Sequence, residues 1–98
     1  MIEPTVGRVV WYTPATKAEM GRKDPGEQPL AAIIAHVHHA GLVNLMIIDR
    51  EGECYWRTNV PLNQDPTITR EPGTCEWMPY QKGQAAKTEQ LEERLAKP

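Results

Sequence analysis

Hydrophobic and polar residues alternate along several short segments of the chain, and this period-two pattern predicts β-strands. The clearest case is the segment LVNLMIID, in which Val43, Leu45 and Ile47 fall on one face and the intervening residues on the other. Residues typical of turns separate the segments from one another. The predicted strands are residues 6–12, 30–38, 42–49, 54–60 and 75–80.

The connections between these segments differ in length. The second and third strands are joined by HAG, and the third and fourth by DREGE, in which Gly52 stands where a type I turn with a G1 bulge requires glycine. Long loops rich in proline, glycine and charge are predicted at 13–29 and 61–74, with Pro61 ending the fourth strand. The part from Thr13 to Gln28 lacks apolar anchors to offset its ordering entropy, so we expect it to be mobile.

This order of elements predicts a mainly β fold, a small five-stranded SH3-like barrel over residues 1–81. An OB-type barrel is the main alternative, although it would have longer opening strands. Residues 82–98 contain good helix formers and are predicted to form a C-terminal α-helix. Its apolar positions form a weak amphipathic stripe of Ala85, Thr88, Leu91 and Leu95.

Composition and charge narrow the function classes. A chain of 98 residues has room for one domain, and its net charge of −2 gives no overall attraction to DNA or anionic lipid. The longest nearly apolar run, residues 30–37, is too short to span a bilayer. The opening MIEPTVGR lacks the basic start and apolar core of a signal peptide. We therefore expect a soluble intracellular protein with reduced thiols.

Three histidines lie close together in the segment IAHVHHAG. His36 and His38 are two positions apart on a predicted strand, so they share a face and could ligate one Zn²⁺ if further ligands joined them. His39 is expected to point elsewhere or to lie in the turn. The candidate further ligands, Asp49, Glu53, Cys54 and Cys75, follow no metal-binding spacing. We interpret the histidines as the polar end of a strand and predict no metal site and no cofactor.

The cysteines Cys54 and Cys75 form no CxxC motif. Neither has a sequence neighbour that would lower its pKa and make it a nucleophile. Each alternates in phase with a tryptophan, and we expect both to be small core residues. The alternation predicts that one face of the fourth strand carries Cys54, Trp56, Thr58 and Val60.

All the aromatic residues are Trp or Tyr, and a barrel this small can rarely hold every ring in its core. Strand alternation points Tyr55 away from Trp56, so some rings must lie outside. Exposed rings beside a charged loop suit a groove for an extended peptide or a stacking platform for bases. Scattered surface aromatics without a role are the simpler alternative. The hypothetical aromatic and basic binding face consists of Arg8, Tyr12, Tyr55, Arg57 and Tyr80.

Several segments together carry a resemblance to a known group of proteins. They are PTVGRVVWY, PLAAIIAHV, VNLMIID, TNVPL and, most distinctively, WMPYQKGQAAKTE. They resemble small uncharacterised proteins encoded by tailed bacteriophages and prophages of Proteobacteria. The resemblance covers most of the chain and implies a phage or prophage product made in the host bacterial cytoplasm. It supplies no catalytic residues.

The sequence therefore favours a non-enzymatic module that binds a phage or host protein through its Trp/Tyr face and the loop Thr13 to Gln28. A single-stranded nucleic-acid-binding accessory protein using the same face is the alternative. An enzyme ranks third, because no nucleophile, base and orienting group can be assembled. No membrane partner is expected, and the oligomeric state stays open.

Overall fold

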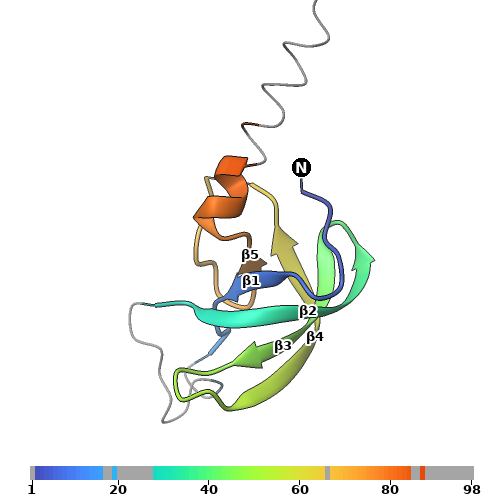
Figure 1. The fold of residues 1–98 in the computed structure, drawn as a ribbon. Helices are drawn as coiled ribbons and strands as arrows, with labels where there is room; N and C mark the ends of the chain where they lie inside the picture. Colours follow the sequence, from blue (N-terminus) through green and yellow to red (C-terminus); the bar gives the residue numbers. More distant parts are fainter. Residues whose placement is uncertain (1, 17–18, 20–27, 66, 85–86, 88–98) are drawn as a thin grey trace, which may run out of the picture.

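The computed structural model describes residues 2–16, 19, 28–65, 67–84 and 87. Within this part of the protein, five strands follow one another around a closed barrel (Figure 1). They are β1 (Val9–Tyr12), β2 (Leu30–His39), β3 (Leu42–Ile48), β4 (Cys54–Asn63) and β5 (Cys75–Glu76). Neighbours pair antiparallel except β4 and β5, which are parallel. The closed barrel confirms the predicted small five-stranded β-barrel, and its consecutive strand order differs from the Greek-key order of an OB-type barrel.

The predicted strands β2 and β3 match the structure to within one residue at their ends. The first strand begins only at Val9, because Gly7, at φ 95°, makes a turn in which the Arg8 amide donates to the Thr5 carbonyl at 3.2 Å. The predicted end of the fourth strand at Pro61 is wrong. β4 continues to Asn63, because Pro61 lies where the strand passes from its last pair with β3 to its first pair with β5.

The barrel interior holds the apolar side chains that the alternation predicts. The buried core consists of Val10, Tyr12, Leu30, Ala32, Ile34, Val43, Leu45, Ile47, Val60, Leu62, Cys75 and Trp77. Cys75 is therefore a core residue, as predicted, and burial raises the pKa of its thiol to about 12. The same prediction for Cys54 is wrong, since that cysteine is exposed.

A β-bulge in β4 explains the error at Cys54. Val43 of β3 pairs with Val60, but Leu45 pairs with Arg57, so β4 has one residue more than β3 between these pairs. Asn59, at φ 54°, occupies this bulge. The extra residue reverses the alternation, so Val60 is buried while Cys54, Trp56 and Thr58 point outward. The prediction that these four residues share one face is wrong.

The hairpin between β3 and β4 is built as the sequence predicts. Gly52 has φ 89°, and its amide donates to the Asp49 carbonyl at 2.9 Å. The Asp49 carboxylate closes the turn by accepting from the amides of Glu51 and Glu53 at 2.9 and 3.0 Å. This turn fixes the register of the two strands that it joins.

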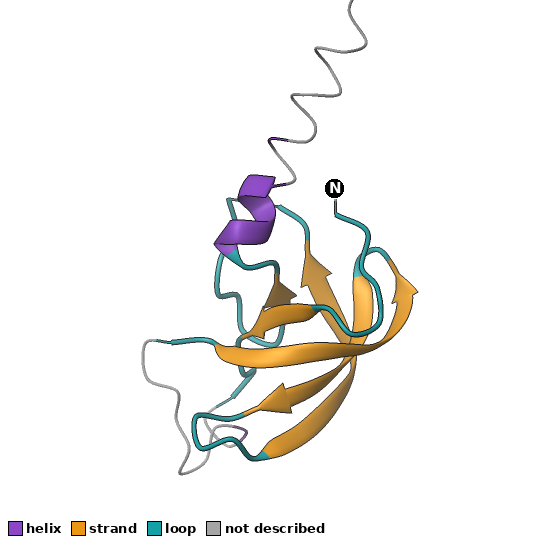
Figure 2. Cartoon of the chain, viewed as in Figure 1, coloured by secondary structure: helices purple, strands orange, loops and turns teal. Residues whose placement is uncertain are grey.

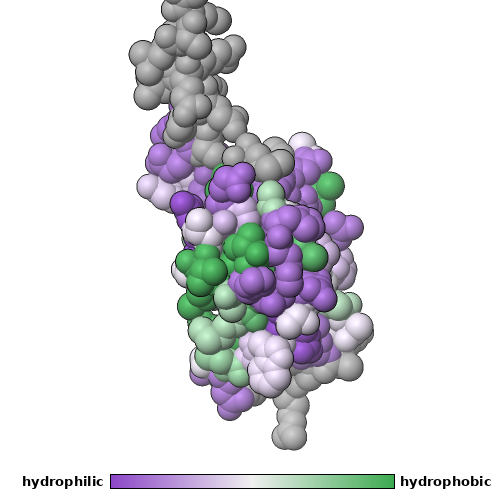
Figure 3. All heavy atoms as spheres, turned by 90° about the vertical axis from the view of Figure 1, so that its right-hand side faces the viewer, coloured by the Kyte–Doolittle hydropathy of each residue, from purple (hydrophilic) through white to green (hydrophobic). Residues whose placement is uncertain are grey.

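The apolar residues are not confined to the interior. Figure 3 shows hydrophobic surface gathered along one side of the barrel, while the rest of the visible face is mostly hydrophilic. The exposed large apolar side chains include Met46 and Trp56, which lie on neighbouring strands.

A short helix follows β5 at residues 79–84, three positions earlier than predicted (Figure 2). The predicted fifth strand 75–80 is wrong beyond Glu76, where β5 ends, and Pro79 suits the first helical position. The side chain of Gln81 reaches back to accept from the Met78 amide at 2.7 Å, as in one half of a capping box. Of the predicted stripe, Ala85, Thr88, Leu91 and Leu95 lie outside the described residues.

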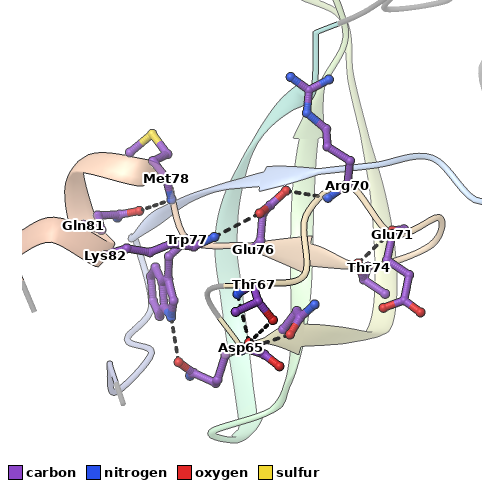
Figure 4. Close-up of polar contacts among 12 residues, drawn as sticks. Asp65, Thr67, Arg70, Glu71, Thr74, Glu76, Trp77, Met78, Gln81 and Lys82 are labelled. Atoms are coloured by element: carbon purple, nitrogen blue, oxygen red, sulfur yellow. Dashed lines mark hydrogen bonds and ion pairs between the residues drawn. The ribbon is translucent and has the colours of Figure 1, made fainter. Parts of the chain in front are cut away.

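Polar contacts fix this helix to the barrel. Gln81 donates to the Val9 carbonyl at 3.0 Å, and Lys82 forms an ion pair with the buried Glu76 at 3.2 Å (Figure 4). The Trp77 indole donates to Gln64 at 3.0 Å. Gln64 also donates to the carbonyls of Ile2 and Ala40, so it joins the N-terminal segment, the β2–β3 turn and the residue after β5.

The first part of the loop predicted at 13–29 is attached to the barrel. Thr13 exchanges backbone hydrogen bonds with Thr74 and Gly73, and Pro14 is buried. Glu19 contacts the barrel, as described below. The expectation that the loop lacks anchors is therefore wrong for its described part, whereas residues 17–18 and 20–27 lie outside the described residues.

Candidate functional site

The outer side of β2, β3 and β4 carries a continuous set of uncharged side chains. Residues directly paired across antiparallel strands point to the same side of the sheet. Ile33 pairs with Met46, and Met46 pairs with Trp56. In the next outward-facing row, Ala31, Ile48 and Cys54 are paired in the same way. We define the outer apolar face as Ala31, Ile33, Met46, Ile48, Cys54 and Trp56.

Trp56 is the most accessible ring of this face, with 75% of its surface exposed. It stands beside Met46, a flexible apolar residue that can adapt to a partner surface. Around the barrel, the same rows continue onto β1 with Val9 and Trp11. The guanidinium of Arg70 lies 6.0 Å from the Trp11 ring centroid, so cation–π contact partly covers this extension.

Polar side chains border the outer apolar face where β2 ends. The rings of His36 and His38 lie edge to face with centroids 4.7 Å apart, so these two histidines share a side as predicted. The Asn44 side-chain oxygen accepts from the Asn59 amide at 2.9 Å. The same oxygen lies 2.9 Å from His38 Nε2, which must therefore be the donor.

His39 lies in the turn, where its Nδ1 accepts from the Gly41 amide at 3.1 Å. The described residues contain no group of three His, Cys, Asp or Glu side chains placed to hold a metal ion. The hydrogen bonds of His38 and His39 each engage one ring nitrogen in a contact with a neighbouring residue. These two histidines are occupied by structural contacts.

A second cluster forms where Glu19 meets the barrel. Tyr55 donates to Glu19 Oε2 at 3.1 Å, and Arg57 Nε lies 3.4 Å from Glu19 Oε1. The Arg57 guanidinium also stacks over the Tyr55 ring at 5.1 Å. The Tyr12 side chain, inside the barrel, lies close enough to the same carboxylate for Glu19 to raise its pKa. We call Tyr12, Tyr55 and Arg57 the carboxylate clamp.

Burial and the Glu19 charge raise the pKa of both tyrosines of the clamp well above their ordinary value. For Tyr12 the causes, in decreasing order, are burial, its hydrogen bond to Glu19 and repulsion of a phenolate by Glu19. For Tyr55 they are burial, the Glu19 charge and then the hydrogen bond. Both hydroxyls therefore stay protonated well into the alkaline range, and that of Tyr55 donates to the carboxylate.

The predicted aromatic and basic face is not built as expected. Tyr12 is only 2% exposed, so its assignment to a surface is wrong. Tyr55 and Arg57 do lie together, but around Glu19. Tyr80 belongs to the helix at 79–84 and Arg8 to the exposed segment before β1. In the described residues neither joins the carboxylate clamp.

Sequence reasoning missed the two features that dominate this surface. The outward position of Trp56 depends on the bulge, for which Asn59, a residue type that tolerates positive φ, was the only local signal. The role of Glu19 depends on a contact with residues far along the sequence. A single charged residue in a charged loop gives no periodic signal that could reveal it.

Comparison with known proteins returned no match to a family model, to a curated protein or to a solved structure. Among the described residues, the structure holds no helix with the length and apolar character that a membrane crossing requires. The outer apolar face, with its exposed Trp56 and Met46, is the candidate binding surface.

Proposed function

We propose that this protein is a non-enzymatic binding module whose outer apolar face docks on an apolar surface of a partner protein. The observation that carries the proposal is the pairing of Ile33, Met46 and Trp56 across three neighbouring strands, with Trp56 75% exposed. Contiguous apolar patches on otherwise polar proteins mark interaction surfaces. The phage origin implied by the sequence stays a prediction, under which the partner is a phage or host protein.

The chemistry of the face supports a partner of this kind. None of its residues carries a charge, so a charged or strongly polar partner surface would lose hydration there without compensation. Tryptophan is among the residue types that most often dominate binding energy at such surfaces, and truncating one typically costs about 2 kcal/mol or more. We therefore expect Trp56 to be the main anchor.

Nucleic acid fits this surface less well. Affinity for nucleic acid rests mainly on Lys and Arg contacts to phosphates, and the outer apolar face supplies none. Trp56 alone could stack on a base, which contributes about 1–3 kcal/mol. Such binding would be weak and would depend on cations elsewhere on the protein.

The decisive experiment compares two aromatic positions of nearly equal exposure. Trp56 and Tyr80 are 75% and 73% exposed but belong to β4 and to the C-terminal helix. A partner identified by photo-crosslinking from position 56 in bacterial cells is purified, and its Kd is measured against wild type, Trp56→Ser and Tyr80→Ser. We expect Trp56→Ser to weaken binding by about tenfold or more and Tyr80→Ser to leave it unchanged.

Three results would contradict the proposal. Equal binding by wild type and Trp56→Ser would remove the face from the interaction. Sub-micromolar binding of a single-stranded oligonucleotide at physiological salt, lost at high salt, would favour the nucleic-acid function. A dimer in sedimentation analysis that Trp56→Ser dissociates would assign the face to a second copy of the protein.

A further inference from the structure

We propose that the carboxylate clamp is a second binding site, specific for a carboxylate group, and that Glu19 occupies it as an internal stand-in for the carboxylate of a partner protein. This site is separate from the outer apolar face and does not depend on the function proposed for that face. Its external ligand would be an acidic side group or the terminal carboxylate of a polypeptide.

The donors of the clamp converge on one carboxylate from different parts of the barrel. Tyr12 comes from β1, and Tyr55 and Arg57 come from one side of β4. One oxygen of Glu19 accepts from the Tyr55 hydroxyl at 3.1 Å, and the other lies 3.4 Å from Arg57 Nε. A carboxylate offers lone pairs on both oxygens, so phenol and guanidinium donors can be satisfied together.

Burial around the ion pair is unequal. The Glu19 side chain is 7% exposed, whereas the Arg57 side chain is 45% exposed. The carboxylate is thus largely removed from water while the cation that neutralises it stays open to solvent. A ligand can therefore approach Arg57 first and reach the tyrosine hydroxyls once Glu19 withdraws.

Glu19 is attached to the clamp mainly through its own carboxylate. Its backbone is supported locally, since the Glu19 amide donates to the Thr16 hydroxyl at 3.2 Å. The Ala15 amide adds a weak contact to the carboxylate at 3.4 Å. Among the described residues, both contacts come from positions close to Glu19 in the sequence, so we expect that Glu19 can leave the clamp while the strands that hold the donors keep their pairing.

The charge balance selects the ligand. The described clamp has one cation, Arg57, which matches the single negative charge of a carboxylate. A phosphate near neutral pH carries up to two negative charges and would remain partly uncompensated in a site this buried. The two tyrosine hydroxyls are neutral donors, which suits the oxygen atoms of a carboxylate.

The test empties the site and offers a simple carboxylate. Sodium acetate is titrated against wild type, Glu19→Gln and Glu19→Ala, with sodium chloride at matched ionic strength as the control. Tyrosine ring signals in NMR and the Tm are followed. We expect a saturable acetate effect beyond chloride that is largest in Glu19→Ala, smaller in Glu19→Gln and absent in wild type, because only the folded state binds.

Arg57→Ala in the Glu19→Ala background should abolish the acetate effect, whereas Tyr80→Phe in that background should leave it intact. A short peptide with one glutamate should bind Glu19→Ala at least about tenfold more tightly than its glutamine counterpart. If Glu19→Ala is unfolded, refolding by acetate but not chloride supports the site. No saturable acetate effect in either Glu19 variant would overturn the proposal, as would an equal effect in wild type.

Discussion

Asn59 decides which way the first half of β4 faces. Its φ of 54° places it in the left-handed region, which glycine and asparagine tolerate and β-branched residues avoid. The Asn44 side-chain oxygen accepts from its amide, so the bulge leaves this donor satisfied. Without the extra residue, Trp56 would turn toward the core and Tyr55 away from Glu19.

The effect of a substitution at Asn59 on stability should therefore depend on how readily the new residue adopts a positive φ. We expect Asn59→Gly to change the free energy of unfolding little and Asn59→Val to lower it by about 1–3 kcal/mol, measured by urea unfolding. Thr58→Val, at the exposed neighbouring position of the same strand, is the matched control and should be nearly neutral. If Asn59→Val were as stable as Asn59→Gly, the strained bulge would be refuted.

The two cysteines should differ in reactivity. Cys54 is exposed and should react with a thiol reagent such as dithionitrobenzoate in the native protein. Cys75 is buried with its pKa raised, so we expect it to react only after unfolding. Cys54→Ser should then abolish the native reaction, while rapid reaction of both thiols in wild type would contradict the buried position of Cys75.

At the scale of elements, β5 and the helix behave as one unit. Glu76 is 5% exposed, and its carboxylate is held by Lys82 of the helix and by the Arg70 amide at 2.9 Å (Figure 4). A buried carboxylate that loses a partner keeps its desolvation cost. The ion pair therefore couples the docking of the helix to the pairing of the shortest strand.

Removal of Lys82, the cationic partner of Glu76, should destabilise the barrel. We expect Lys82→Ala to lower the free energy of unfolding by about 1–3 kcal/mol in urea, less than the loss typical of a fully buried ion pair because the Arg70 amide remains. Lys87→Ala, at an exposed lysine farther along the sequence, should have no measurable effect. Equal stability of the two variants would show that the ion pair contributes nothing to docking.

The elements differ in how far the sequence could predict them. β2 and β3 have regular alternation over Leu30–Ile34 and Val43–Ile47, so local pattern sufficed. The sequence could not predict that β4 continues beyond Pro61, because this continuation depends on pairing with β3 and β5. The segment after Glu76 looked like a strand because it contains Trp77, yet Pro79 starts a helix there. The clamp rests on Glu19 meeting β4, a long-range contact that leaves no local pattern.

At the scale of the whole molecule, three buried or partly buried proton donors respond to the same change of pH. Burial raises the pKa of Cys75 to about 12 and holds the pKa values of Tyr12 and Tyr55 well above their ordinary value of 10.0. Folding thus favours the protonated form of each group. Their contribution is complete below the ordinary thiol value of 9.0 and is lost as the pH rises above it.

We therefore expect the free energy of unfolding, from urea titrations, to be insensitive to these groups between pH 7 and 9 and to fall steadily above pH 9. Cys54→Ser, which changes only an exposed thiol, should show the same profile. We expect Cys75→Ala to be less stable than wild type at neutral pH. Its free energy of unfolding should fall less than that of wild type when the pH is raised above 9. Undiminished stability at pH 11 would show that these groups ionise freely in the folded protein.

The seam that closes the barrel has a consequence for folding kinetics. β1 and β5 pair through Trp11 with Glu76 and Tyr12 with Cys75, residues separated by more than half the sequence. The β2–β3 and β3–β4 pairings need only short hairpin loops, so they incur far less loop-closure entropy. The three-stranded meander is expected to form early and the seam to close last. When the native protein opens transiently, the same seam is expected to part first, uncovering Trp77 and Cys75 while β2 to β4 stay paired.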